Sequence, residues 1–447
     1  APMTVITGHV RTFYQLLLNT GLVSVINFTV WFAVTFWTYL QTKSVFATGL
    51  ISGIFLVLTA FTGIWFGSLV DNHRKKTVLQ GSAVASLVFY GSALAVYLVV
   101  PEAAFRDPAD ARLWAFVLLL MSGVIAGNIR TIALPTLVTL LIDEDRRDRA
   151  NGLVGTVSGT TFLVTSVISG VLVAFDGMLS VLLLALVVLG LSVLHLVFVP
   201  IPEMVSPHES GATSGIDVRG TLRIIAGVPG LFALILFSTL NNFLGGVFMA
   251  LADAYGLSLV SVQAWGLLWG VLSTGMIIGG IAVSRTGLGK RPLRLLLLIN
   301  MVLWAIIMIF PLWASIIPMA IGMYLYMLLM PYAEAAEQTI LQRVVPYERQ
   351  GRVFGLAQSV EQAASPLTAF LISPITQFIF IPFMSDGGAG AAAIGSWFGT
   401  GADRGIALVF VLTGVLGILA TAIALASRPY RALSARVASA EPEPAPA

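Results

Sequence analysis

The stretch Gly67-Ser-Leu-Val-Asp-Asn-His-Arg-Lys-Lys-Thr-Val-Leu79 gathers an acid, a histidine and three cations between two long apolar runs. Charges of this density are costly in the hydrocarbon of a membrane, whereas the runs on either side are long enough to cross one. The stretch is therefore typical of a short loop between two membrane-spanning helices.

The composition of the whole chain supports this interpretation. Of its 447 residues, 57% are hydrophobic and 10% are charged, and the mean hydropathy is +0.94. A soluble domain carries roughly 25% charged residues. The apolar runs are continuous and far longer than the alternating segments of about 10 residues that form an outer-membrane barrel. We therefore expect an all-α polytopic membrane protein, with no removable secretion signal in its first residues.

Long apolar segments broken by Gly, Pro or charge predict twelve membrane-spanning helices. A polar linker over 200–220, rich in Pro, Gly and Ser, separates an N-terminal bundle of six helices (1–199) from a C-terminal bundle of six (221–428). Residues 429–447 are expected to form a disordered tail. The helices are predicted at 12–40, 45–69, 77–100, 112–142, 150–175, 178–199, 221–251, 258–284, 292–311, 314–345, 351–382 and 404–427.

The placement of Lys and Arg predicts the orientation. If the N-terminus is inside, all but a few of the 24 cations fall in loops on that side. The positive-inside rule then places both termini and the linker in the cytoplasm. The Gly-rich segment 385–401 becomes an external lip, too rich in glycine to be predicted as a stable helix.

The two halves also resemble each other. The stretch Leu137-Val-Thr-Leu-Leu-Ile-Asp-Glu-Asp-Arg-Arg-Asp-Arg-Ala-Asn-Gly-Leu153 aligns without a gap on Ile340-Leu-Gln-Arg-Val-Val-Pro-Tyr-Glu-Arg-Gln-Gly-Arg-Val-Phe-Gly-Leu356. An acid, two arginines, a glycine and a leucine match, and both copies join the fourth to the fifth helix of their half. This pattern indicates duplication in parallel orientation, with two pseudo-symmetric bundles related by an axis along the membrane normal.

Twelve helices, a cytoplasmic linker and the opening loop together resemble the major facilitator superfamily (MFS). Its signature in this loop is Gly-x-Leu-x-Asp-x-x-Gly-Arg-Arg/Lys. The chain has Arg74 where the second Gly is expected, and matches at Gly67, Leu69, Asp71, Lys75 and Lys76. With the stretch Gln342-Arg-Val-Val-Pro-Tyr-Glu-Arg-Gln-Gly-Arg-Val-Phe-Gly355, this departure resembles the drug:H+ antiporter branch, which includes macrolide and multidrug exporters, the enterobactin exporter and lysophospholipid transporters.

The resemblance implies a cytoplasmic gate. Asp71 would close the cytoplasmic face against the opposite half in the outward-open state, with Lys75 as a cationic partner for acids of the repeated stretch. In the second half Ser284 falls about where Asp71 would lie, so the latch is predicted to be lopsided. The alternative is that the cations only anchor the topology. The residues that we assign to the gate are Gly67, Asp71, Arg74, Lys75, Asp145, Arg149 and Arg352.

Four ionisable residues fall inside predicted spans, namely Arg130, Glu334, Glu337 and Glu361. Each costs roughly 2.5–3.5 kcal/mol at a helix centre, so such groups usually face an interior or a wet cavity and usually act. Glu334 and Glu337 share one helix face and should titrate as a coupled pair, which would let one hold a proton at neutral pH. We assign all four residues to proton coupling, with Arg130 as a candidate partner of these acids across the cavity. The alternative is a buried ion pair that fixes helix packing.

Two groups of residues are candidates for binding substrate. In this family the first and seventh helices line the cavity, so their amides could contact a ligand, although hydrogen bonds between helices would explain them equally well. Near Glu334, aromatic and polarisable side chains suit large amphiphilic ligands, although side chains facing lipid would give the same pattern. The residues are Asn19, Asn27, Asn241, Asn242, Tyr326, Met330 and Tyr332.

Other chemistry is not indicated. The chain has no Cys and four scattered His, so we expect no metal site. No phosphate-binding loop of the Gly-x-x-x-x-Gly-Lys-Ser/Thr type occurs, and we expect no ATP drive, cofactor, enzymatic activity or nucleic-acid partner. The glycine signature of antiporters, ending Gly-Pro-x-x-Gly-Gly, is absent from the fifth helix, which weakens the inference to antiport.

The leading hypothesis is a monomeric secondary transporter in the bacterial cytoplasmic (inner) membrane. It would export amphiphilic, drug-like small molecules by proton antiport, with alternating access between its two halves. The alternatives are a lysophospholipid or siderophore transporter of the same fold, an uncoupled facilitator, and a receptor or scaffold that has lost transport.

Overall fold

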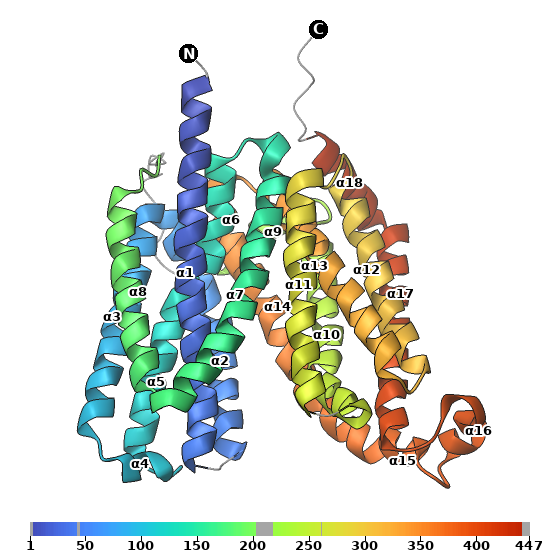
Figure 1. Ribbon diagram of the computed structural model, residues 1–447. Coiled ribbons are helices and arrows are strands. Elements are labelled where there is room, and N and C mark those ends of the chain that lie inside the picture. Colours follow the sequence, from blue (N-terminus) through green and yellow to red (C-terminus); the bar gives the residue numbers. More distant parts are fainter. Residues whose placement is uncertain (1–2, 43–44, 203–217, 261, 440–447) are drawn as a thin grey trace. The chain divides into compact units, whose positions relative to one another are not determined.

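The computed structural model describes residues 3–42, 45–202, 218–260 and 262–439, and these ranges are helical apart from short connections (Figure 1). Twelve helices within them are long and apolar enough to cross a membrane, judged by length and composition. The prediction of an all-α protein with twelve spans is therefore confirmed. Hydrocarbon favours this form because a helix bonds its own backbone N–H and C=O groups. Most of the predicted linker, 203–217, lies outside the described residues, as does the end of the predicted tail, 440–447.

The chain divides into two compact units. Each unit includes a segment from the other half of the sequence, because the start of the fifth span belongs to the second unit and the start of the eleventh span belongs to the first. The first unit comprises Ala1–Arg147, Val157–Thr221 and Val345–Ser359, and the second comprises Asp148–Thr156, Leu222–Val344 and Val360–Ala447.

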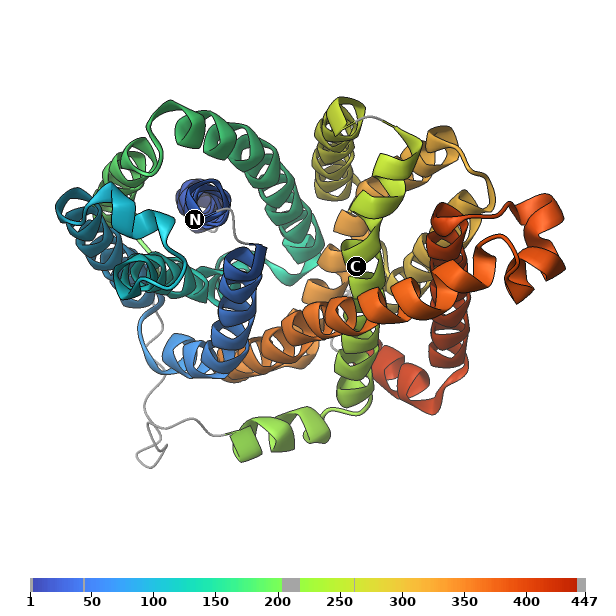
Figure 2. The ribbon, with the colours of Figure 1, turned by 90° about the horizontal axis from the view of Figure 1, so that it is seen from below.

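The first unit is built around its first helix. Figure 2 shows α1 end-on and enclosed by other helices of this unit, and α1 packs against α2, α5, α6 and α8. Aromatic rings form its core, with the Trp37 and Phe116 centroids 5.3 Å apart and Phe105 between α3 and α5. Its elements are α1 (Met3–Thr42), α2 (Val45–Asn72), α3 (Lys75–Val99), α4 (Glu102–Arg106), α5 (Ala111–Gly127), α6 (Ile129–Leu141), η1 (Glu144–Arg146), α7 (Arg147–Asp176) and α8 (Leu179–Phe198).

The fourth span is interrupted at its centre. Helix α5 ends at Gly127 and α6 begins at Ile129, so that Asn128 separates two segments of one span, Ala111–Leu141. A Cβ atom on Gly127 would fall 1.8 Å from Asn27 Nδ2, and this contact brings the fourth span close to α1. The interruption places Arg130 in the first turn of α6, against α1 and α3.

The second unit has its own aromatic core, in which the ring centroids of Tyr255 and Phe410 are 5.7 Å apart and those of Phe310 and Phe410 are 5.8 Å apart. Helix α12 packs against α13 and α17, and α11 packs against α13. Its elements are α9 (Val218–Gly227, at the boundary of the units), α10 (Leu231–Leu259), α11 (Val262–Thr286), α12 (Pro292–Ile309), η2 (Phe310–Leu312), α13 (Ile316–Val344), α14 (Tyr347–Ile375), the π-helix η3 (Thr376–Phe380), α15 (Ile381–Met384), α16 (Ala389–Phe398), α17 (Ala402–Ala426) and α18 (Arg428–Ser439).

Three segments differ from the predictions. The predicted seventh helix is two helices, since Gly230 has a left-handed φ of 83° and separates α9 from α10. The Gly-rich lip contains a helix, α16, whose last residue contributes a carbonyl to the buried guanidinium of Arg404. The predicted tail begins with α18, which packs against α10, α13 and α17 through Leu433 and Val437. In the lip and the tail, tertiary contacts stabilise helices that local composition does not favour.

Candidate gate and carboxyl cluster

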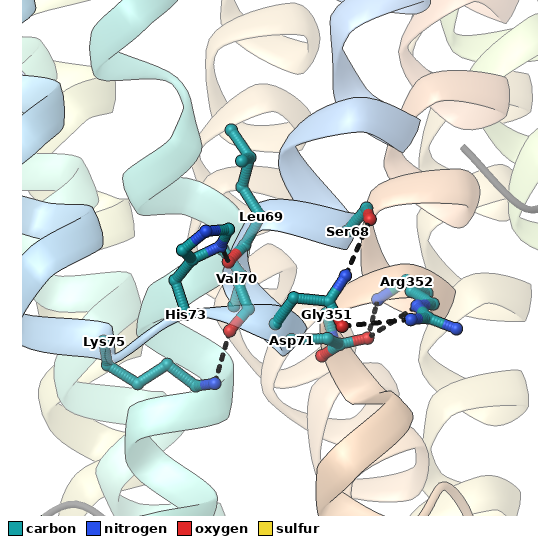
Figure 3. A network of polar contacts seen from close by, with 9 residues as sticks. Ser68, Leu69, Val70, Asp71, His73, Lys75, Gly351 and Arg352 are labelled. Atoms are coloured by element: carbon teal, nitrogen blue, oxygen red, sulfur yellow. Dashed lines mark hydrogen bonds and ion pairs between the residues drawn. The ribbon is translucent and has the colours of Figure 1, made fainter. Parts of the chain in front are cut away.

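The loop that opened the sequence analysis ends α2 and places Asp71 against the start of α14. The side chain of Asp71 is 2% exposed. Its Oδ1 accepts a 2.7 Å hydrogen bond from the Gly351 N–H, and its Oδ2 accepts a 2.8 Å bond from the Arg352 N–H (Figure 3). The partial positive charge near a helix N-terminus favours an anion at this place. Asp71 therefore joins the first half of the sequence to the second.

Small residues allow this approach. A Cβ atom on Gly67 would lie 2.4 Å from the Gly351 carbonyl oxygen, and one on Gly351 would lie 2.4 Å from Asp71 Oδ1. Helices in lipid associate closely where such residues face each other, because hydrocarbon supplies no hydrophobic drive. Gly67, Asp71 and Gly351 thus form one interlocked contact.

Cations surround this contact. Arg352 Nε lies 3.8 Å from Asp71 Oδ2, and Arg352 Nη2 donates a 3.1 Å hydrogen bond to Asn72 Oδ1. Lys75 is buried and donates to the Val70 carbonyl (Figure 3). Its Nζ also lies 5.3 Å from the centre of the Tyr347 ring. The charge of Lys75 also acts on Asp71. The other predicted gate residues, Arg74, Asp145 and Arg149, are exposed.

In the second unit, three carboxyl groups belong to α13 and α14. Ser238 Oγ on α10 donates a 2.7 Å hydrogen bond to Glu337 Oε1. The carboxyl groups of Glu337 and Glu361 lie close enough to act on each other. The sequence paired Glu337 with Glu334; the charge of Glu337 acts both on Glu334 and on Glu361, which lies on the next span.

Glu334 has a different environment. The residue is exposed, and its charge acts on Tyr326. Within the part of the chain that the structure describes, neither Glu334 nor the pair Glu337 and Glu361 forms an ion pair with Lys, Arg or His. Buried acceptor atoms without a partner also occur here, at Glu361 Oε1 and Gln338 Oε1.

Arg130 is held entirely by its own unit. The residue is 1% exposed, and its Nη1 donates to Asn19 Oδ1 at 2.8 Å and to Thr20 Oγ1 at 3.4 Å, while Nη2 donates to the Leu79 carbonyl at 3.3 Å. Asn19 Nδ2 is also 3.1 Å from His195 Nδ1. Among the described residues no carboxylate pairs with Arg130. These contacts tie α6 to α1 and α3.

The predicted substrate amides take part in helix contacts. Asn27 accepts a 2.7 Å bond from the Tyr90 hydroxyl, Asn241 accepts a 2.9 Å bond from Trp304 Nε1, and Asn242 donates to the Ser238 carbonyl on its own helix. Asn19 likewise accepts from Arg130. For Asn19, Asn27 and Asn241, these bonds support the alternative that the amides join helices. Tyr326, Met330 and Tyr332 are half-buried, and the Tyr332 hydroxyl lies 3.3 Å from Thr286 Oγ1, at the end of α11.

Asp148 and Asn151, at the start of α7, make contacts that were not predicted from the sequence. Asp148 Oδ2 accepts a 2.7 Å hydrogen bond from the Leu288 N–H, in the loop after α11. Asn151 Nδ2 donates to Thr339 Oγ1 and Gln342 Oε1, each at 2.9 Å. The sequence repeat could have indicated the Asp148 contact, because Asp148 aligns with Gly351, whose N–H bonds to Asp71.

Comparison with known proteins settles the family. Residues 16–369 match the Major Facilitator Superfamily. The chain belongs to this family. It is accordingly a multi-pass membrane transporter and not an enzyme.

Relatives and solved structures agree with this assignment. The chain is 22% identical to macrolide efflux protein A of Enterococcus faecalis, over 69% of this chain and 94% of that protein, and 21% identical to macrolide efflux protein A of Streptococcus pyogenes, over 76% and 83%. In fold it is similar to a bacterial homologue of the iron transporter ferroportin (TM-score 0.69, 15% identity, 93% of this chain and all of that one). It is also similar to the human organic anion transporter MFSD10 (TM-score 0.69, 14% identity, 92% and 99%).

Proposed function

We propose that this MFS secondary transporter exports amphiphilic small molecules by proton antiport, with alternating access between its two halves. Relatives named macrolide efflux proteins support drug export. Their bacterial origin supports a place in the bacterial cytoplasmic membrane.

The observation that carries proton coupling is the proximity of two carboxyl groups, of which Glu337 accepts a 2.7 Å bond from Ser238 Oγ and Glu361 has a buried oxygen, Oε1, without a partner. Two carboxyl groups in contact hold one proton more readily than two negative charges, and releasing that proton leaves two anions that repel each other. No cation pairs with either residue in the described part of the chain. The pair therefore has the chemistry of a proton carrier, with Ser238 as the donor that orients Glu337.

Glu334 and Tyr326 are the residues that we assign to the substrate. Glu334 is exposed on α13, and its charge acts on Tyr326 of the same helix. A carboxylate beside an aromatic ring suits a cationic amphiphile, whose amine would meet the acid while its apolar body meets the ring. Such a ligand would favour proton release from the neighbouring pair.

The contact between Asp71 and the start of α14 serves as the cytoplasmic latch in this proposal. Asp71→Asn replaces one acceptor oxygen by an N–H donor and removes the charge from the other, so one of the two hydrogen bonds is lost and the other is weakened; cycling should slow while ligand affinity is largely unchanged. Arg130, which bonds to Asn19, Thr20 and Leu79, is assigned to positioning α6 within its unit.

Transport by proteoliposomes tests the proposal. Vesicles with an acidic interior should accumulate radiolabelled erythromycin beyond the level reached by protein-free vesicles, because protons leaving drive the drug inward. Glu337→Gln and Glu361→Gln should each lower this pH-driven uptake at least tenfold and retain exchange of drug for drug. The matched control is Glu102→Gln, an exposed acid paired with Arg106 on α4.

Each alternative has its own outcome. Protein-dependent uptake that ignores the pH gradient would identify a facilitator. Movement of lysophosphatidylethanolamine in place of erythromycin would favour the lipid transporter. Full pH coupling in both Gln variants would show that the carrier lies elsewhere.

A further inference from the structure

The junction between α11 and α12 repeats the geometry of the junction between α2 and α3. Placing Lys75, the first residue of α3, on Pro292, the first residue of α12, aligns three positions of the preceding helices. They are Gly63 with Gly280, Gly67 with Ser284, and Asp71 with Leu288. The counterpart of Asp71 is therefore Leu288, four residues beyond the Ser284 that was expected from sequence.

The helices that face these junctions correspond as well. The gapless alignment of the two repeated stretches places Asp148 on Gly351 and Gly152 on Gly355, and its continuation places Thr156 on Ser359. The boundaries of the compact units fall at Thr156 and Ser359, at equivalent positions of α7 and α14.

Contacts made by small residues follow the same correspondence. A Cβ atom on Gly63 would lie 2.0 Å from Ser359 Oγ, and one on Gly280 would lie 2.4 Å from Thr156 Oγ1. One turn further along, Gly67 meets α14 at Gly351 and Gly355, and Ser284 meets α7 at Gly152. The pair α2 and α14 and the pair α11 and α7 are thus packed alike, each joining the two halves of the sequence.

The polar contact at the end of each pair is reversed. In the first pair, the carboxylate of Asp71, in the last turn of α2, accepts from the Gly351 N–H on the long helix. In the second pair, the Leu288 N–H on the loop donates to the carboxylate of Asp148 on the long helix, again at 2.7 Å. Equivalent backbone positions are joined in both places, with donor and acceptor exchanged.

The loop backbone is shaped for this second bond. Gly287, directly before Leu288, has a left-handed φ of 68°, and a Cβ atom there would lie 2.5 Å from Asp148 Oδ2. A side chain at this position would both strain the backbone and displace the carboxylate. The second oxygen of Asp148 accepts a 2.7 Å bond from the Arg149 N–H, which fixes the rotamer.

We propose that Asp148 is a second gating residue, which closes the α7 and α11 junction as Asp71 closes the α14 and α2 junction. The inference rests on the proposed alternating access and is independent of what is transported. Opening of the cytoplasmic side separates both pairs in one transition, so loss of either carboxylate favours the open form. The gate has two latches of opposite polarity and is not lopsided.

The test uses the absence of cysteine from the sequence, which lets nitroxide labels be placed at chosen pairs of sites. Thr77 with Glu348 reports on the first junction, and the equivalent residues Arg294 with Asp145 report on the second. All four are exposed. Distances between labels are measured by electron spin resonance in nanodiscs, without substrate or pH gradient.

Asp148→Asn should raise the ratio of open to closed molecules about tenfold at both label pairs, and Asp71→Asn should do the same. Asp143→Asn, an exposed acid in the same loop, is the control and should change neither distance. A change confined to the Arg294 and Asp145 pair, or no change, would overturn the gating role, because a local structural contact would not move the distant junction.

A second variant guards against misfolding. Gly287→Ala keeps the charge of Asp148 but strains the loop backbone and displaces the carboxylate from Leu288, so it should shift both pairs in the same direction. If Asp71→Asn shifts both pairs while Asp148→Asn and Gly287→Ala shift neither, the inference fails and alternating access stands. If all three variants leave both distances unchanged, the two-latch gate and the proposed alternation fail together.

Discussion

Ser238 on α10 and Glu337 on α13 are joined by a 2.7 Å hydrogen bond, which links the seventh span to the carboxyl pair of Glu337 and Glu361. Ser238→Ala removes this donor and should cost about 1–3 kcal/mol of stability. A double-mutant cycle with Glu337→Gln checks the pairing, because the cost of Ser238→Ala should fall when the partner is changed. Equal costs in both backgrounds would mean that the bond contributes nothing.

Arg130 depends on Asn19 for its shortest hydrogen bond. Asn19→Ala leaves the buried guanidinium with fewer acceptors, and we expect a loss of about 1.5–3 kcal/mol, seen as a lower unfolding temperature in detergent. Gln15→Ala is the control, since Gln15 lies on the same helix and is half-buried. If both variants unfold at the same temperature, the Asn19 contact is not needed to hold Arg130.

The close approach of α2 to α14 should be sensitive to a single methyl group. Gly351→Ala places a Cβ atom 2.4 Å from Asp71 Oδ1 and must displace one of the helices. Thermal stability should fall. Gly53→Ala, also on α2, meets nothing within 4 Å and should be neutral or stabilising by up to about 1 kcal/mol. A harmless Gly351→Ala would contradict the packing described here.

Helix α18 should be released by a change at Gly230. This residue has a φ of 83°, and a Cβ atom there would lie 2.4 Å from the Pro429 carbonyl oxygen and 2.7 Å from Leu433 Cβ. Gly230→Ala is therefore expected to speed hydrogen exchange across Arg428–Ser439 about tenfold or more. Gly227→Ala, which meets nothing within 4 Å, serves for comparison. Unchanged exchange in Gly230→Ala would show that α18 does not depend on this contact.

Sequence alone predicts the spans because hydropathy and helix length are local properties of a membrane protein. It does not predict which acids meet. Spacing along one helix places Glu334 and Glu337 on one face, whereas the partner of Glu337 comes from the next span and depends on how α13 and α14 pack. The repeat shows that Asp148 and Gly351 are equivalent. It does not show that each takes part in the same kind of hydrogen bond, Asp148 through its carboxylate and Gly351 through its N–H.

Buried cations illustrate the same limit. Arg404 begins the last predicted span, 404–427, yet it is 1% exposed and donates to the Tyr255 hydroxyl at 2.7 Å and to the Pro311 carbonyl at 2.9 Å. These acceptors come from distant parts of the second half. Charge type alone therefore does not separate a cation that faces water from one that holds a helix end together.

The exchange of helix starts between the two halves has a consequence for biogenesis. The hydrogen-bond partner of Asp148, Leu288, is synthesised 140 residues later, and the partner of Asp71, Gly351, is synthesised 280 residues later. At about 5–20 residues per second, ribosomes need roughly 7–28 s and 14–56 s to deliver these partners. During that interval the newly inserted first bundle lacks the N–H groups of Leu288 and Gly351, so its assembly cannot be completed by the first half alone.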